Sequence, residues 1–169
     1  SGTRIWATYY GGIDAERVLA VTVAMGNAYL AGTTESPSGI ASNGFQNTYG
    51  GGITRGDAFL VKFDASGSRL CATYFGGNKD EWGQQQHVAA DGFGNVYLAG
   101  CTSSASGIAS GGFQNTLTGG YDAYLVKFSS CFTPLTSTTA STEILCNDDC
   151  NGTATANAFG GTSPYTYLW

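Results

Sequence analysis

An internal repeat constrains the fold of this chain more than any other feature of its sequence. The stretch GIASNGFQNT at 39–48 returns as GIASGGFQNT at 107–116, with nine of ten positions identical. Three further blocks recur in the same order: ATYYGG and ATYFGG (7–12 and 72–77), GNAYLAGTT and GNVYLAGCT (26–34 and 94–102), DAFLVKF and DAYLVKF (57–63 and 122–128). A chain that contains one unit twice is expected to fold as two similar, neighbouring units.

The repeated blocks outside this loop are typical of β-strands. In DAFLVKF, Phe59, Val61 and Phe63 share one face of a strand, whereas Ala58 and Leu60 share the other. Apolar residues on both faces predict a sheet that is covered on both sides. The first unit is predicted to contain four strands, at about 18–23, 27–34, 57–63 and 68–75.

Turns rich in Gly, Asn and Asp separate these strands. Gly26-Asn27 predicts a tight hairpin in the first unit, and DGFGN at 91–95 predicts its counterpart in the second. DASG at 64–67 is predicted to turn the third strand into the fourth.

The size of the repeat indicates the architecture. The copies are offset by 65 or 68 residues, and the differences fall between the blocks, where surface loops tolerate insertions. Four strands in a unit of this size are typical of a β-propeller blade. We therefore predict an all-β chain with two four-stranded antiparallel blades. A closed ring needs about four to eight blades, so the alternatives are further blades upstream or an open pair.

The blocks YYGG, GNAYLAGTT, GFQNT, DAFLVKFDASGSRLCATYFGG and VAADGFGNVYLAG resemble the SBBP β-propeller repeat over about residues 3–128. That family recurs in large secreted and surface proteins of bacteria, including Bacteroidota. The resemblance implies propeller blades over residues 1–131, with an outer strand at 3–10, a first blade at 11–75 and a second at 76–128. The second copy stops after its third strand. Residues 3–10 match the fourth strand of a copy, so they are a candidate for the missing fourth strand of the second blade.

The C-terminal part of the chain has a different composition. Residues 132–142, FTPLTSTTAST, are rich in Thr and Ser and are predicted to form an extended linker. TATANAF at 153–159 alternates small polar and apolar residues, which predicts a half-buried strand.

Residues 143–169 resemble the start of the SprB repeat, an immunoglobulin-like module. The residues that carry this resemblance are Cys146, Cys150, Asn151-Gly152, Gly160-Gly161-Thr162, Pro164-Tyr165 and Trp169. The family occurs in tandem on gliding-motility adhesins and other type IX-secreted surface proteins. The resemblance implies a truncated β-sandwich module in an extracellular, disulfide-permissive setting.

The five cysteines contain no C-x-x-C pair, and the chain has one His, so a tetrahedral zinc site is not expected. Cys146 and Cys150 are predicted to form a small-loop disulfide; the alternative is two free or separately paired thiols. The remaining Cys71, Cys101 and Cys131 are odd in number, so at least one is free or pairs outside this chain.

Few residues are candidates for chemistry, and we expect neither catalysis nor a cofactor. The single His87 occurs in one copy only, so the repeat does not require it. Asp57 and Asp122 precede equivalent strands and are predicted to cap turns, with calcium binding as the alternative. Asp148 and Asp149 are calcium candidates as well, although a solvated turn is the favoured interpretation of NDDC at 147–150.

Aromatic and amide side chains are the remaining candidates. Trp82, in a polar stretch, and Trp6 are candidates for sugar binding, although aromatic residues also pack blades together. Phe45 and Phe113 are predicted to anchor the repeated loop by burial. The loop's own backbone groups are expected to bond to four amide side chains: Gln46, Asn47, Gln114 and Asn115.

Charge and hydropathy narrow the possible partners. Seven basic and twelve acidic residues give a net charge of −5 and no basic stripe, so nucleic acid is not an expected partner. No apolar run reaches the roughly 20 residues that cross a bilayer. The sequence begins at Ser1 and ends within a predicted strand at Trp169. We therefore expect a fragment whose partners are further blades and immunoglobulin-like modules of its own chain.

The expected function is a non-catalytic repeat segment of a large secreted or cell-surface protein that serves display, spacing or adhesion. The alternative is a lectin-like propeller that binds extracellular glycans or another polysaccharide surface. An enzyme with its active site in other blades is the least favoured interpretation, because the two copies show no cluster of acids or His.

Overall fold

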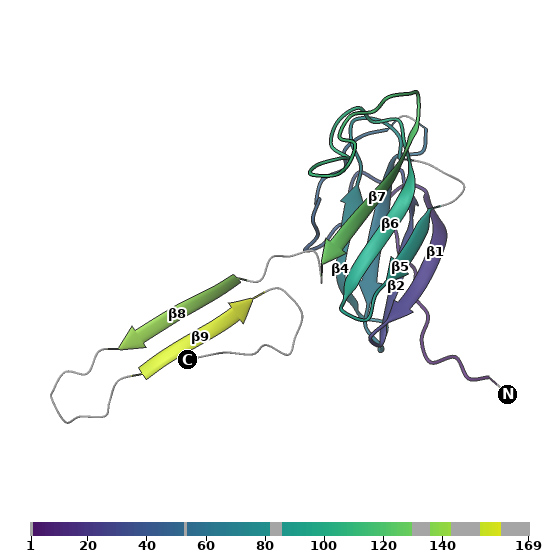
Figure 1. Ribbon diagram of the computed structural model, residues 1–169. Helices are drawn as coiled ribbons and strands as arrows, with labels where there is room; N and C mark the ends of the chain where they lie inside the picture. The colour runs from purple at the N-terminus through teal and green to yellow at the C-terminus, as the bar shows by residue number, and fades with distance from the viewer. Residues whose placement is uncertain (1, 53, 82–85, 130–135, 143–152, 160–169) are drawn as a thin grey trace. The chain divides into compact units, whose positions relative to one another are not determined.

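A computed structural model describes residues 2–52, 54–81, 86–129, 136–142 and 153–159 (Figure 1). The chain divides into two compact units, Ser1–Phe132 and Thr133–Trp169. All regular elements in the described residues are β-strands, as predicted. They are β1 (Glu16–Ala24), β2 (Asn27–Thr34), β3 (Asp57–Phe63), β4 (Arg69–Phe75), β5 (His87–Ala90), β6 (Asn95–Thr102), β7 (Asp122–Ser129), β8 (Thr136–Thr142) and β9 (Thr153–Phe159).

The strands form two antiparallel sheets and a separate hairpin. The first sheet has the order β1-β2-β3-β4, which confirms the four strands predicted for the first unit. The second sheet has the order β5-β6-β7. Strands β8 and β9 pair with each other in the C-terminal unit. The two sheets stay open and do not complete a ring.

The turns form where the sequence predicted them, except that the first hairpin turn is centred on Met25-Gly26, one residue before the predicted Gly26-Asn27. Met25 and Gly26 both have positive φ, 52° and 74°, as the two central residues of a type I′ hairpin require. In the DASG turn, Asp64 Oδ1 accepts hydrogen bonds from Ser66 N and Ser68 N, both at 2.9 Å. An Asp side chain that bonds to the following backbone is a standard turn device, which explains why this segment reverses direction.

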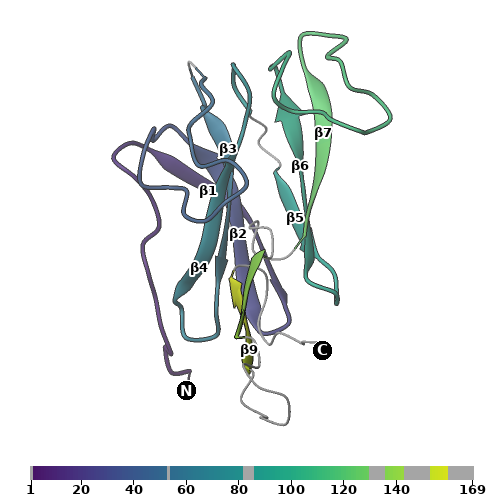
Figure 2. The same ribbon diagram turned by 90° about the vertical axis from the view of Figure 1, so that its left-hand side faces the viewer.

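The first sheet is covered on both faces, as the strand pattern predicted. All seven residues of β3 are buried. On one face Ala58, Leu60 and Phe75 join a core with residues of the second sheet, including Leu98. On the other face Phe59, Val61 and Phe63 pack with Ile40, Ala72 and Tyr74. Figure 2 shows the two sheets side by side in the N-terminal unit.

Equivalent residues of the two copies make equivalent aromatic contacts. Phe75, at the end of β4, lies 5.1 Å from Tyr124 and 5.9 Å from Phe128, measured between ring centroids. Tyr10 occupies the corresponding place in the first YYGG block and lies 5.4 Å from Phe59 and 5.9 Å from Phe63. In each copy, an aromatic residue from the segment that precedes the sheet therefore packs on the two aromatic rings of that sheet's third-strand block.

Three sequence-based expectations about the elements are corrected. Residues 3–10 form no strand, because they lie against a face of the first sheet through Trp6 and Tyr10 and not along a free strand edge. The second sheet has three strands, not four, because no fourth strand pairs with β7 among the described residues. The predicted linker 132–142 contains β8, since its β-branched Thr residues favour a strand once β9 supplies a partner.

Among the described residues, no helix is long and apolar enough to span a membrane.

Candidate functional site

The repeated loop is held by its own amide side chains. In the first copy, Asn47 Oδ1 accepts a hydrogen bond from Gly44 N at 3.0 Å, and its Nδ2 donates to Gly44 O at 2.9 Å. Gln46 Nε2 donates to Thr48 O at 2.9 Å and to Asp57 Oδ2 at 3.3 Å. These bonds confirm that the amide side chains satisfy backbone groups of the loop.

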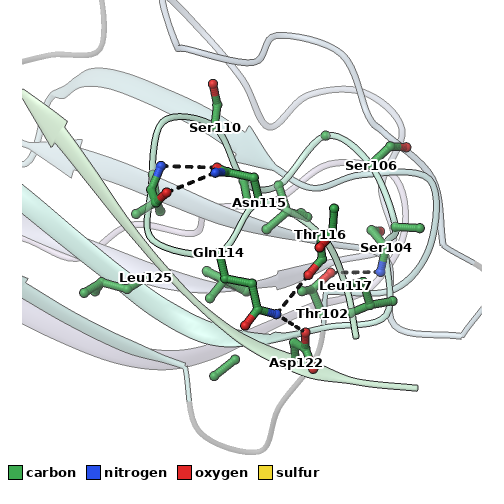
Figure 3. A pocket seen from close by; sticks show the side chains of 18 of the residues that line it. Thr102, Ser104, Ser106, Ser110, Gln114, Asn115, Thr116, Leu117, Asp122 and Leu125 are labelled. Atoms are coloured by element: carbon green, nitrogen blue, oxygen red, sulfur yellow. Dashed lines mark hydrogen bonds between the residues drawn. The ribbon is translucent and has the colours of Figure 1, made fainter. Parts of the chain in front are cut away.

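The second copy repeats the arrangement bond for bond (Figure 3). Asn115 exchanges the same pair of hydrogen bonds with Gly112, at 3.2 and 3.0 Å. Gln114 Nε2 donates to Thr116 O and to Asp122 Oδ2, both at 2.9 Å. The predicted amide roles of Gln114 and Asn115 are thus confirmed, and the loop is an architectural device in both copies.

Asp57 and Asp122 close this loop onto the start of the third strand of each copy. Asp57 Oδ2 accepts from Gly50 N at 2.7 Å, and Asp122 Oδ2 accepts from Thr118 N at 3.0 Å. Acceptance of N–H groups from the loop is what a turn cap does. Among the described residues, no group of three or more His, Cys, Asp or Glu is placed to hold a metal ion.

Asp57 is fully buried, and its Oδ1 atom has no hydrogen-bond partner among the residues that the structure describes. Burial raises the pKa of Asp57 to about 7, with the Gly50 N–H acting in the opposite direction and the Glu81 carboxylate adding to the rise. The folded chain therefore holds a proton that the unfolded chain releases above about pH 4. Stability from this group is complete below about pH 4 and is lost as the pH rises through 7.

We predict that Asp57→Asn flattens this pH dependence. Between pH 5 and pH 8 the free energy of unfolding of the parent should fall relative to that of the variant by on the order of 2 kcal/mol. Urea titrations at both pH values measure the difference. Asp122→Asn is the matched control, because Asp122 is only partly buried. Parallel pH profiles for the parent and Asp57→Asn would contradict the prediction.

A second pair of carboxylates, which the sequence reasoning missed, lies at the entry to each copy. Glu81 Oε2 accepts from Gly77 N at 3.0 Å and its Oε1 accepts from Thr102 Oγ1 at 2.8 Å. Glu16 makes the same bonds with Gly12 N at 3.1 Å and Thr34 Oγ1 at 2.8 Å. We call Glu16 and Glu81 the junction carboxylates. Alignment of YYGGIDAE with YFGGNKDE would have revealed them.

Glu81 is fully buried and joins the two sheets. Burial raises its pKa, and hydrogen bonds from Ser104, Thr102 and Gly77 act in the opposite direction. The carboxylate reaches from the segment after β4 to the end of β6, so it fixes the second copy relative to the first. A buried carboxylate with several donors is a strong local constraint.

The aromatic candidates occupy different environments from those expected. Phe45 is 65% exposed, so the prediction that it is buried is wrong, although its ring lies 5.9 Å from that of Phe128 in the second sheet. Phe113 is fully exposed, so the prediction that it is a buried anchor is wrong: no neighbouring sheet faces it in the described residues. Trp6 packs 6.3 Å from Phe63 and donates from Nε1 to Ala65 O at 3.1 Å, which is a packing role.

Several predicted site residues lie outside the described residues. These are Trp82, Asp148, Asp149, Cys146 and Cys150. His87 begins β5 and is exposed. Cys101 is an exposed free thiol.

The second copy also contains an open pocket of about 760 Å³. It lies between β7 and the loop 104–118, and Figure 3 shows its polar wall of Thr102, Ser104, Gln114 and Asp122. Ile108 and Leu117 supply apolar lining. The arrangement offers a strand edge on one side and a loop on the other.

A family model described as the SprB repeat matches residues 138–169. The match supports the SprB-type interpretation of the C-terminal segment. It also suggests that the chain includes a repeat region of a large cell-surface protein.

Proposed function

We propose that this chain is a non-catalytic segment of a large exported surface protein, in which stacked β-propeller-type repeats of the SBBP kind space or display the modules that follow. One observation carries the proposal: the same junction is made at the entry to both copies. Tyr10 and Glu16 meet the first sheet as Phe75 and Glu81 meet the second. Repeats that present the same joint at each entry are suited to addition in series.

The SprB repeat match at residues 138–169 supports the surface setting, because that repeat is found in surface proteins. The role is mechanical and positional: the sheets hold the chain in a defined path, and the loops close on themselves. The described loop side chains Gln46, Asn47, Gln114 and Asn115 are engaged with their own backbone. Contact with other surfaces then falls to the modules that the repeats display.

Binding to a glycan array distinguishes this role from a lectin. The spacing role predicts no saturable binding of the purified chain to any immobilised glycan or polysaccharide. A Trp82→Ala variant is the control, because Trp82 is the residue that a lectin interpretation would use. Saturable binding that this variant loses would overturn the spacing role in favour of glycan recognition.

A further inference from the structure

The pocket beside β7 occupies the place that β4 fills in the first copy. There, β4 lies between β3 and the repeated loop. Ser42 and Ala72 exchange two backbone hydrogen bonds, each of 2.9 Å, and Tyr74 N donates to Gln46 O at 3.0 Å. In the second copy the loop 104–118 is present and β7 pairs only with β6 among the described residues. We call the space between this loop and β7 the acceptor slot.

A glycine in the loop shows that the acceptor slot is shaped for a strand. A Cβ atom at Gly44 would lie 2.3 Å from Ala72 O and 2.8 Å from Thr73 Cα, so β4 leaves room for hydrogen only. Its counterpart Gly112 has no atom within 4 Å of the same position. Gly112 also has no positive φ that would call for glycine. The second loop thus keeps the clearance, although no strand in the described part of the chain fills it.

The polar groups of the acceptor slot are also matched to a strand. In the first copy, Gly76 N donates to Gln46 Oε1 at 3.1 Å, and Thr73 Oγ1 accepts from Gln46 N at 2.8 Å. In the second copy Gln114 is engaged only through Nε2 within the described part of the chain. An incoming strand that carries a Thr, and a Gly three residues later, would supply Gln114 with the two hydrogen-bond partners that Gln46 has in the first copy.

The chain carries a segment with this chemistry at its other end. Residues 7–12, ATYYGG, match 72–77, ATYFGG. Tyr74 is 1% exposed, and its OH donates to Ser36 O at 3.0 Å, whereas the equivalent Tyr9 is fully exposed. Ile5, in the same segment, is 90% exposed. Residues 3–10 therefore have the sequence of a fourth strand, but in this structure they do not pair with a third strand.

We propose that the acceptor slot binds residues 3–10 of a second copy of this chain as an antiparallel β-strand. The proposal rests on the repeat equivalence that also underlies the proposed function. The register follows from β3 and β4, where Phe59 faces Tyr74, so Tyr9 lies opposite Tyr124. Pairing at a strand edge supplies main-chain bonds, and the pocket for Tyr9 beside Ile108 and Leu117 supplies specificity.

The donor belongs to a second copy because of where the segment lies in its own chain. Trp6 and Tyr10 pack on Phe63 and Phe59, on the face of the first sheet opposite to the one that meets the second sheet. The donor and the acceptor slot are thus at opposite sides of the N-terminal unit. Association is head to tail, and such contacts generate rings or open filaments.

Sedimentation velocity over a concentration series tests the proposal with two variants. Tyr9→Asp disables the donor, and Gly112→Leu fills the acceptor slot; neither side chain contacts the free chain's core. The parent should self-associate, and each variant should weaken association by about thirty-fold, the effect of removing an interface hot spot. Phe93→Asp, an equally exposed aromatic in the turn between β5 and β6, is the control and should associate as the parent does.

A mixture of the two variants gives the sharpest result. Tyr9→Asp retains an acceptor slot and Gly112→Leu retains a donor, so an equimolar mixture should form a dimer and nothing larger. A parent that stays monomeric at every concentration, a Tyr9→Asp chain that associates like the parent, or a mixture that forms no dimer would each overturn the proposal. None of these results bears on the glycan-array test, so failure of this inference leaves the proposed function standing.

Discussion

Replacement of Phe75 by Ala should lower the free energy of unfolding of the N-terminal unit by about 3–5 kcal/mol. Phe75 is 3% exposed and is the one β4 residue whose ring packs on both Tyr124 and Phe128. Its removal leaves a cavity in the core that the two sheets share. Because the substitution weakens the contact between the two sheets, we expect the urea transition to broaden as well.

Equilibrium urea unfolding followed by tyrosine and tryptophan fluorescence measures the loss. Tyr10→Ala is the control, because Tyr10 makes the equivalent contact at the open side of the first sheet and is only partly buried. It should cost less than Phe75→Ala and leave the contact between the two sheets intact. Equal losses of unfolding free energy for the two variants would show that the contact between the sheets contributes no more stability than the contact that Tyr10 makes.

The second large effect is a contrast between two leucines at the same repeat position. Leu60 in β3 is completely buried, whereas Leu125 in β7 is 73% exposed. Leu60→Ala should therefore cost about 2–5 kcal/mol, and Leu125→Ala should stay within about 0.5 kcal/mol. Both substitutions remove the same atoms. The difference between their losses of unfolding free energy therefore reports how far each leucine is covered by other parts of the protein.

The comparison is made at low protein concentration, with both variants in the same urea series. A loss at Leu125 as large as that at Leu60 would mean that the outer face of β7 is covered in solution. That result would contradict an open second sheet. Low concentration is needed because, in a donated segment, Tyr10 would lie on the face of β7 that carries Leu125, as Phe75 lies on the face that carries Leu60.

The strands and turns followed from the sequence because their causes are local. The alternation in DAFLVKF and the Gly26 turn place β2 and β3 at their predicted bounds. The hydrogen bonds from the side-chain amides of Gln46 and Asn47 could also be predicted, because the backbone N–H and C=O groups of a loop need hydrogen-bond partners.

What the sequence did not reveal depends on neighbours. Phe113 and Phe45 have the same sequence context, yet Phe45 has the second sheet beside it and Phe113 does not. The sequence does not single out Glu81, because a lone charged residue in a polar stretch is usually solvated. Only its contacts with Gly77 and Thr102 reveal its buried role. Strand β8 forms because β9 pairs with it, and the Thr-rich composition of this stretch does not by itself predict that partner.

The junction carboxylates have a consequence for how such a chain changes length. In each joint the Gly-Gly pair and the Thr lie inside the repeated blocks, and the Glu and Ser lie at equal distances after them in both copies. The length differences between the copies fall outside these residues. A duplication or deletion of one whole unit therefore recreates a joint of the same composition on either side of the cut. Genes of this kind can lengthen or shorten by recombination between copies, and no new interface has to evolve.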